Sequence, residues 1–357
     1  MEAFSGAPAR ITTENTCIEN KDRKEYGSRA HLSGCFFLEN IMKKALKRIG
    51  KILLGIVAVI AVFLLGTCVY DKICLASEKD LLENQIYGQK VEVDGHRMSV
   101  YVSGEGKHTL VFMAGSGDSG PIFSFKDFAD RFDDCRVVII ERFGYGFSDG
   151  FDGPRDVETR VSQDRKALEA AGVEGPFILC PHSYSGLETV YWAQNFPEEV
   201  EAIVGLDMAV PAAYDTFDDS NVRQNNSSNA LMRTLRKMGI VRLLAGSRMG
   251  KEFSPEEEKT AMALVCSRYC NETYAHEADY FVSDRDLVES RKMPDVPTLL
   301  IVSDGSIFNG WIDLEKDYAS QISDATTVQL NCGHAVFSYE PDACEKAMRD
   351  FLNRLEK

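Results

Sequence analysis

Several patterns that mark common protein classes are missing from this 357-residue chain. None of its 10 cysteines lies in a C-x-x-C pair, which speaks against a zinc ribbon or a thioredoxin-type motif. The chain has 40 Lys and Arg against 55 Asp and Glu, and its formal net charge is -15. Because a nucleic-acid surface needs clustered positive charge, we expect no nucleic-acid partner. The glycine-rich stretch 114–117 lacks the G-x-G-x-x-G spacing and a following Lys-Ser/Thr, so it does not indicate a phosphate site.

The one cluster of basic residues lies in the segment 42–51, and an uncharged run from Ile52 to Tyr70 follows it directly. This run is about as long as a bilayer-spanning helix requires, and it ends without the A-x-A site of a cleaved signal peptide. It therefore predicts a single-pass membrane anchor, with a lipoprotein signal at Cys68 as a minor alternative. The basic flank precedes the run, so we expect the rest of the chain on the extracellular, non-cytoplasmic side of the cell membrane.

The first 41 residues are polar and show neither helical nor strand periodicity. Such a segment cannot bury a core, so we expect a disordered tail or an upstream extension. Met42 begins MKKALKRIGK, a plausible start for a membrane-targeted chain, and the start at Met1 or at Met42 stays open. Residues 71–84 are interpreted as a linker to the domain that follows.

Beyond residue 85, short apolar runs alternate with helical patterns. The runs suit parallel strands that are buried on both faces, and they lie at 110–113, 137–140, 177–180, 202–206, 299–302 and 328–330. Helical patterns at 156–171 and 187–195 separate them, which predicts an α/β fold with a mostly parallel sheet and flanking helices. The segment 211–295 carries helical patterns at 229–244 and 255–270 and no confident strand. It predicts a helical cap inserted before the penultimate strand of a core formed by 85–210 and 296–357.

Polar candidates follow the ends of these strands, where α/β sheets bind their ligands. Ser183, in CPHSYSGLE, lies between a strand and a helix, and His334, in NCGHAVF, follows the last strand. Two acids also follow strands: Asp207 after 202–206 and Asp304 after 299–302. The chain order is therefore serine, acid, histidine.

These motifs, together with MAGSGDSGP at 113–121 and ERFGYGFSD at 141–149, resemble the α/β-hydrolase superfamily over residues 85–355. The stretch PHSYSG is similar to the P-H-S-x-S-G elbow of a group of membrane-anchored bacterial members. The resemblance implies a catalytic triad and an oxyanion hole. Their residues would be the nucleophile Ser183, the base His334, the acid Asp207 or alternatively Asp304, and the backbone N–H groups of Ser116 and Tyr184.

The chain departs from the common pattern around the elbow and at the usual acid. Pro181 and Ser185 stand where glycines are usual, and Ser306 stands where one acid is usual. The elbow strains the serine backbone, so its neighbours must be small enough for strand and helix to pass closely. Ser185 meets that need and Pro181 suits an extended residue, so we expect the turn to form.

We therefore expect a serine hydrolase of the carboxylic ester type that cleaves a small, apolar acyl substrate through an acyl-enzyme, with no cofactor and no metal. The alternative is a non-catalytic binding or interaction protein of the same fold, which the departures from the pattern motivate. The side chain of His182 is expected to point away from the serine. Four aromatic residues are expected either to line the pocket or to pack in the core: Phe143, Tyr145, Phe147 and Trp311.

Overall fold

The computed structural model describes residues 16–215, 217–245 and 253–357. Its contacts divide the chain after Leu65 into an N-terminal unit and a second unit, Gly66–Lys357. Helix α1 extends from Thr16 to Ser77, and its last turns belong to the second unit. The section Asn40–Ser77 is long and apolar enough to cross a membrane by length and composition. Its apolar side chains are exposed, as at Leu54 and Val62 with 70% and 71% of their surface accessible.

Two boundaries near the N-terminus differ from the sequence expectations. Residues 16–41, expected to be a disordered tail or an upstream extension, are helical in α1, which differs from a disordered tail and does not test the upstream extension. Residues 1–15 lie outside the described residues. A helix that has already formed extends at the cost of fixing one residue per hydrogen bond, so polar sequence can continue it. The expected linker 71–84 begins as the end of α1 and continues as the short helix α2 (Lys79–Glu83).

An eight-stranded sheet forms the centre of the second unit, in the order β1-β2-β4-β3-β5-β6-β7-β8. The hairpin β1–β2 is antiparallel and β2 pairs antiparallel with β4, whereas all other neighbours are parallel. The predicted mostly parallel sheet is therefore confirmed. The strands are β1 (Gln89–Val93), β2 (His96–Ser103), β3 (Thr109–Met113), β4 (Arg136–Glu141), β5 (Phe177–Ser183), β6 (Val200–Met208), β7 (Thr298–Val302) and β8 (Ala325–Gln329).

Helices cover both faces of the sheet, because the central strands are apolar on both sides. All five residues of β3 are buried, and alternate side chains enter two different core clusters: Val111 joins one cluster and Phe112 the other. The Val111 cluster contains side chains of α4 (Val157–Ala170), α5 (Ser185–Asn195) and α11 (Trp311–Ser320). The Phe112 cluster contains side chains of α3 (Pro121–Ala129), α12 (Val336–Tyr339) and α13 (Pro341–Leu355). A short 3₁₀ turn, η1 (Pro197–Glu199), precedes β6.

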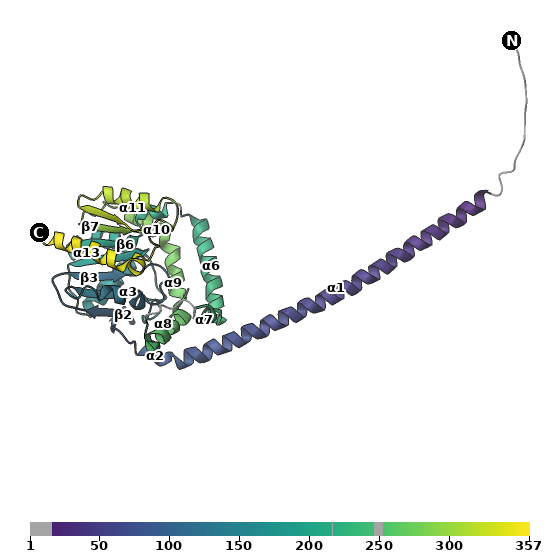
Figure 1. Cartoon of the computed structure of the whole chain (residues 1–357), viewed down its shortest axis with the longest axis horizontal. Helices are drawn as coiled ribbons and strands as arrows, with labels where there is room; N and C mark the ends of the chain where they lie inside the picture. The colour runs from purple at the N-terminus through teal and green to yellow at the C-terminus, as the bar shows by residue number, and fades with distance from the viewer. Residues whose placement is uncertain (1–15, 216, 246–252) are drawn as a thin grey trace, which may run out of the picture. The chain divides into compact units, whose positions relative to one another are not determined.

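The segment between β6 and β7 is helical, as the sequence predicted for 211–295. Figure 1 shows α6, α7, α8 and α9 together at one side of the sheet, in green. The segment comprises η2 (Pro211–Tyr214), α6 (Asp219–Lys237), α7 (Ile240–Ala245), α8 (Pro255–Arg268), α9 (Glu272–Glu277), η3 (Ala278–Tyr280) and α10 (Phe281–Glu289). We call it the cap.

The helix predicted over 229–244 is two helices in the structure. Gly239, with φ of +76°, separates α6 from α7, and its N–H donates to the carbonyl of Arg236. A glycine in the left-handed region just past a helix is a common helix end. A side chain at this glycine would also meet the backbone oxygen of Thr67 in α1 at 2.3 Å. The break is therefore required both by the helix end and by the contact with α1.

Candidate active site

Ser183 lies on a sharp turn at the junction of β5 and α5. Its φ is +53°, a left-handed value that is uncommon for a residue with a side chain. Close packing holds this conformation: a Cβ on Gly186 would be 2.3 Å from the carbonyl oxygen of Ala209, and one on Gly115 would be 2.8 Å from the Cβ of Ser183. Strained serines of this kind mark nucleophile elbows, where the hydroxyl is raised above the sheet.

The two departures at the elbow fit this turn. Pro181 is the residue of β5 that stands opposite Met113 of β3, so the strand continues through the proline to Ser183. Ser185 is fully buried; its hydroxyl accepts the N–H of His182 at 3.0 Å and donates to the carbonyl of Met113 at 2.8 Å. The serine in the usual glycine position therefore ties the elbow to the neighbouring strand.

A histidine and an aspartate meet at the same edge of the sheet. The Nδ1 of His334, in the loop between β8 and α12, is 2.6 Å from Oδ2 of Asp207, near the end of β6. Asp207 is fully buried, and its Oδ1 accepts hydrogen bonds from the Ser303 N–H and the Trp311 Nε1–H, each at 2.8 Å. This bonding makes Nδ1 of His334 the protonated nitrogen, which leaves Nε2 as the basic one.

The structure distinguishes the two candidate acids by position. Asp304 is exposed, and its carboxylate accepts the N–H of Ser306 at 2.9 Å. Hydrogen bonds from the side chain and the backbone N–H of Ser306 hold the pKa of Asp304 below its usual range. Asp207, rather than Asp304, is therefore the carboxylate that contacts His334.

The side chain of His182 was expected to point away from the serine. In the structure, its ring lies against the ring of His334. Its ring centroid is 4.4 Å from that of His334, and its Nε2 is 3.3 Å from the carbonyl oxygen of His334. The rings of Phe125 and Phe337 also contact it. Burial of the ring, and to a lesser degree the neighbouring His334, lower the pKa of His182 to about 3. A neutral His182 therefore packs against the loop that carries His334.

A cavity of about 490 Å³ lies over Ser183. Ser116 and Tyr184, whose backbone N–H groups were predicted to form the oxyanion hole, line it together with Ser183. The remaining walls come from the cap and consist of aromatic rings (Tyr214, Phe217, Tyr274 and Phe281) and of polar residues of α6 (Asn221, Gln224, Asn225 and Ser228). The cap therefore supplies most of the surface that a ligand would touch.

The aromatic residues considered from the sequence are not among those that line this cavity. Phe143, Tyr145, Phe147 and Trp311 are all buried, with at most 4% of their surface accessible. Trp311 instead holds Asp207 through its indole N–H. Sequence patterns miss the true lining because it comes from cap residues whose position depends on how the cap folds back over the sheet.

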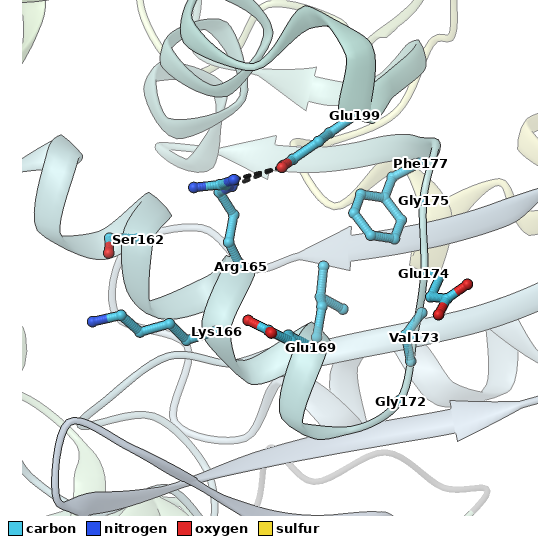
Figure 2. Close-up of a pocket in the computed structure, with 11 residues that line it drawn as sticks. Ser162, Arg165, Lys166, Glu169, Gly172, Val173, Glu174, Gly175, Phe177 and Glu199 are labelled. Atoms are coloured by element: carbon cyan, nitrogen blue, oxygen red, sulfur yellow. Dashed lines mark hydrogen bonds and ion pairs between the residues drawn. The ribbon is translucent and has the colours of Figure 1, made fainter.

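A second cavity, of about 410 Å³, lies at the opposite edge of the sheet and is shown in Figure 2. Phe177, the first residue of β5, lines it, whereas Ser183 is the last residue of this strand. Seven residues of a strand span about 20 Å, so this cavity is separate from the serine. The ion pair between Arg165 and Glu199 crosses it (Figure 2).

Buried charges connect the core to the cap behind the serine. Glu188, in the first turn of α5, is fully buried and pairs with both Arg142 (2.9 Å) and Arg160 (2.5 Å). Arg160 also pairs with Asp284 of α10 in the cap at 2.9 Å. Arg142 donates to the carbonyl oxygen of Ala114 at 2.8 Å, so it also holds the glycine-rich loop beside Ser183.

Glu277 of α9 is the cap residue at the centre of these charges. Its Oε1 is 2.9 Å from the guanidinium of Arg155, and its Oε2 accepts the hydroxyl of Tyr145 at 2.6 Å. The same tyrosine oxygen accepts the N–H of Gly117 at 3.2 Å. Glu277 therefore links the cap to the loop that carries Ser116.

Replacing Glu277 by glutamine is expected to destabilise the fold strongly, because it leaves the buried guanidinium group of Arg155 without its counter-charge. Breaking a buried pair in this way costs about 3–5 kcal/mol. Unfolding of the full chain by urea, followed by fluorescence, measures the change. Glu272→Gln in the same helix is the control: Glu272 pairs with Lys237 at the surface, where a pair contributes about 0–1 kcal/mol. Equal losses for the two variants would contradict the structural role of Glu277.

The pH dependence of this effect has a definite sign. Burial alone would raise the pKa of Glu277, but Arg142, Arg155 and Arg160 together lower it below its ordinary value. A depressed folded-state pKa adds stability above the unfolded-state pKa, which is about 4.3 for glutamate, and this stability is lost as the pH falls. The difference between wild type and Glu277→Gln should therefore shrink below about pH 4.

Among the described residues, no group of three or more His, Cys, Asp or Glu side chains is arranged to hold a metal ion.

Fold and site together define a protein of the α/β-hydrolase fold. Among solved structures, the chain superposes on the epoxide hydrolase VrEH1 of Vigna radiata with a TM-score of 0.60 at 16% identity, over 76% of this chain and 99% of that one. An esterase of Thermogutta terrifontis gives a TM-score of 0.54 at 16% identity, over 75% and 99% of the two chains. At these identities the likeness concerns the fold.

The sequence places the chain more narrowly. It is 30% identical over 330 residues to the uncharacterized protein YbdG of Bacillus subtilis, which covers 88% of this chain and 100% of that protein. The chain therefore belongs to the same protein family as YbdG. No family model matches the sequence.

Proposed function

We propose that this protein is a serine hydrolase that cleaves a small, apolar carboxylic ester or related acyl compound through an acyl-enzyme. The observation that carries the proposal is the strained Ser183 beneath a cavity, with the His334–Asp207 pair at the same edge of the sheet. Neither feature alone is specific, because serines occur in many turns and histidine–aspartate pairs occur in many cores. Their combination on this fold is typical of acyl transfer.

Each residue has a chemical role in the proposed reaction. The Oγ of Ser183 attacks the ester carbonyl carbon while Nε2 of His334 takes its proton, and Asp207 stabilises the imidazolium that forms. The N–H groups of Ser116 and Tyr184 donate to the oxyanion of the tetrahedral intermediate. His334 then returns the proton to the leaving alcohol, and a water molecule, activated by the same nitrogen, hydrolyses the acyl-enzyme.

The lining of the cavity supports an acyl substrate with an apolar part. The rings of Tyr214, Phe217 and Phe281 form an aromatic wall, while the α6 wall is polar. The solved neighbour VrEH1 is named an epoxide hydrolase. Hydrolases of that kind use an aspartate nucleophile, and the elbow of this chain carries serine, so an ester is the better supported substrate class.

We also propose that the uncharged segment Ile52–Tyr70 anchors the protein in the cell membrane. The section Asn40–Ser77 of α1 supports this by its length and composition. The basic residues in 42–51 precede the segment, which by the positive-inside tendency puts the hydrolase domain on the extracellular, non-cytoplasmic side.

Covalent labelling by a fluorophosphonate tests the proposed chemistry, because only an activated serine reacts with it. The full chain in detergent micelles is treated with the probe, digested and analysed by mass spectrometry. We expect one adduct, on the peptide that contains Ser183, and none in heat-denatured protein. A folded chain that stays unlabelled would favour the non-catalytic binding protein instead.

A further inference from the structure

The cap is attached to the end of the anchor helix. The hydroxyl of Thr67 donates to the carbonyl of Met238 at 2.8 Å, and the thiol of Cys68 donates to the carbonyl of Lys237 at 3.4 Å. One turn further along α1, Asp71 accepts a hydrogen bond from Arg242 of α7 at 2.7 Å. The junction between α6 and α7 therefore contacts the last residues of the uncharged segment.

These contacts fix the depth of the junction between α6 and α7 if the segment Ile52–Tyr70 spans the bilayer. Helix α7 follows this junction, and its Arg242 pairs with Asp71 and Glu78 just beyond the end of the segment. Thr67 lies three residues before the end of the segment, which is about 4.5 Å along a helix. A cap residue that contacts Thr67 is therefore at the level of the lipid headgroups. Helix α7 presents an apolar side chain there, because Leu243 has 50% of its surface accessible.

An apolar cavity of about 370 Å³ lies beside α7. Its walls include Met232 and Leu235 of α6, Ile240 and Val241 of α7, and Val265 of α8. Its volume falls within the range of sites for small molecules, about 300–1,000 Å³. A hydrocarbon chain is the ligand that such a lining would select, because aliphatic side chains make up most of it and Tyr269 is the one described lining residue with a polar side-chain group.

One face of α6 connects this apolar cavity with the cavity over Ser183. Residues 221, 224, 228, 232 and 235 follow at helical spacings of three and four, so they lie along one face. The first three line the cavity over the serine, and the last two line the apolar cavity. The polarity of the face changes between Ser228 and Met232, one turn apart.

We propose that the cavity bounded by α6, α7 and α8 binds the acyl chain of a lipid from the bilayer in which α1 is anchored. The proposal rests on the anchor and not on the hydrolase chemistry. The headgroup-level position of the junction between α6 and α7, the exposed Leu243 of α7 and the apolar lining argue for a lipid chain over a soluble peptide.

Tryptophan quenching by brominated lipids tests the proposal on the full chain. The chain is reconstituted in phosphatidylcholine–phosphatidylglycerol vesicles whose acyl chains are brominated near the headgroup end. The variant Val241→Trp reports from the cavity and Leu243→Trp from the outer side of α7. The native Trp192 and Trp311 are buried in the core, and the wild-type signal is subtracted.

We expect the added fluorescence of both variants to fall by about half or more, as for side chains in contact with lipid chains at the interface. Quenching of Leu243→Trp alone would overturn the cavity as a lipid site, as would quenching of neither. Met232→Trp probes the cavity from α6 if Val241→Trp does not fold. Tyr339→Trp, exposed on α12 outside the cap, is the control that should stay unquenched.

A further variant tests the membrane anchor separately from the lipid site. Ile60→Trp, in the middle of the uncharged segment, is quenched by lipids brominated deep in the acyl chain if the segment spans the bilayer. An unquenched Ile60→Trp would overturn both the anchor and the lipid site. Because the measurement needs no turnover, it is independent of whether Ser183 is a nucleophile.

Discussion

Replacing Ser183 by alanine is expected to abolish fluorophosphonate labelling and to lower ester hydrolysis by about 10⁴–10⁶-fold. The substitution removes the only atom that forms the acyl-enzyme bond in the proposed mechanism. It changes the fold little, since alanine keeps the Cβ that already packs near Gly115 and the backbone conformation is held by the contacts of the turn. Turnover of p-nitrophenyl esters by the full chain in micelles measures the effect.

The control for this variant is Ser306→Ala. Ser306 is an exposed serine in the loop after β7, and it stands where the sequence pattern had suggested an acid. Because its hydroxyl takes no part in the proposed reaction, its loss should leave turnover unchanged. Ester hydrolysis that survives in Ser183→Ala at the wild-type rate would rule out this serine as the nucleophile.

Asparagine in place of Asp207 is expected to lower kcat/KM by about 10³–10⁴-fold. The amide oxygen can keep the hydrogen bonds from Ser303 and Trp311, but the amide NH₂ then faces Nδ1 of His334. His334 must accept that N–H, which moves its own proton to Nε2. The nitrogen that should take the serine proton then carries one already, so the base is lost while the fold is kept.

Asp304→Asn is the matched control, because it makes the same chemical change in the other candidate acid. Its carboxylate is exposed and bonded to Ser306, so we expect turnover within about twofold of wild type, as for surface changes away from a site. Steady-state kinetics on the two variants side by side decides between the acids. A large loss in Asp304→Asn with an active Asp207→Asn would reverse the assignment.

Much of the architecture follows from local sequence patterns. The continuous apolar runs predicted the parallel strands β3 to β7, because a strand buried on both faces has no polar side to show. The run 328–330 only overlaps the end of β8 (Ala325–Gln329), since this edge strand is half-buried and mostly polar. The same patterns placed Ser183 and His334 at strand ends, because a loop follows its strand directly in the sequence. Boundaries were less well predicted where tertiary contacts decide them: Gly239 ends α6 against Thr67, and Pro181 is paired within β5 opposite Met113.

The partners of the site residues required the tertiary structure. Asp207 lies near the end of β6 and Asp304 follows β7. Only the folded structure places Asp207 against His334, while the carboxylate of Asp304 accepts the N–H of Ser306. The contact between the rings of His182 and His334 joins residues 152 positions apart in the chain. No local pattern carries such information, because it depends on how separate loops meet at one edge.

The sequence by itself determined the fold class, the uncharged segment before the domain and the residue types available for acyl chemistry. These properties depend on composition and short-range periodicity, which can be recognised in each segment without knowing its contacts to the others. Only the tertiary structure decided which acid meets the histidine, which cap residues line the cavity and how buried charges such as Glu188 and Glu277 join cap to core. Those features arise from contacts between segments far apart in the chain, whose energies exist only once the chain is folded.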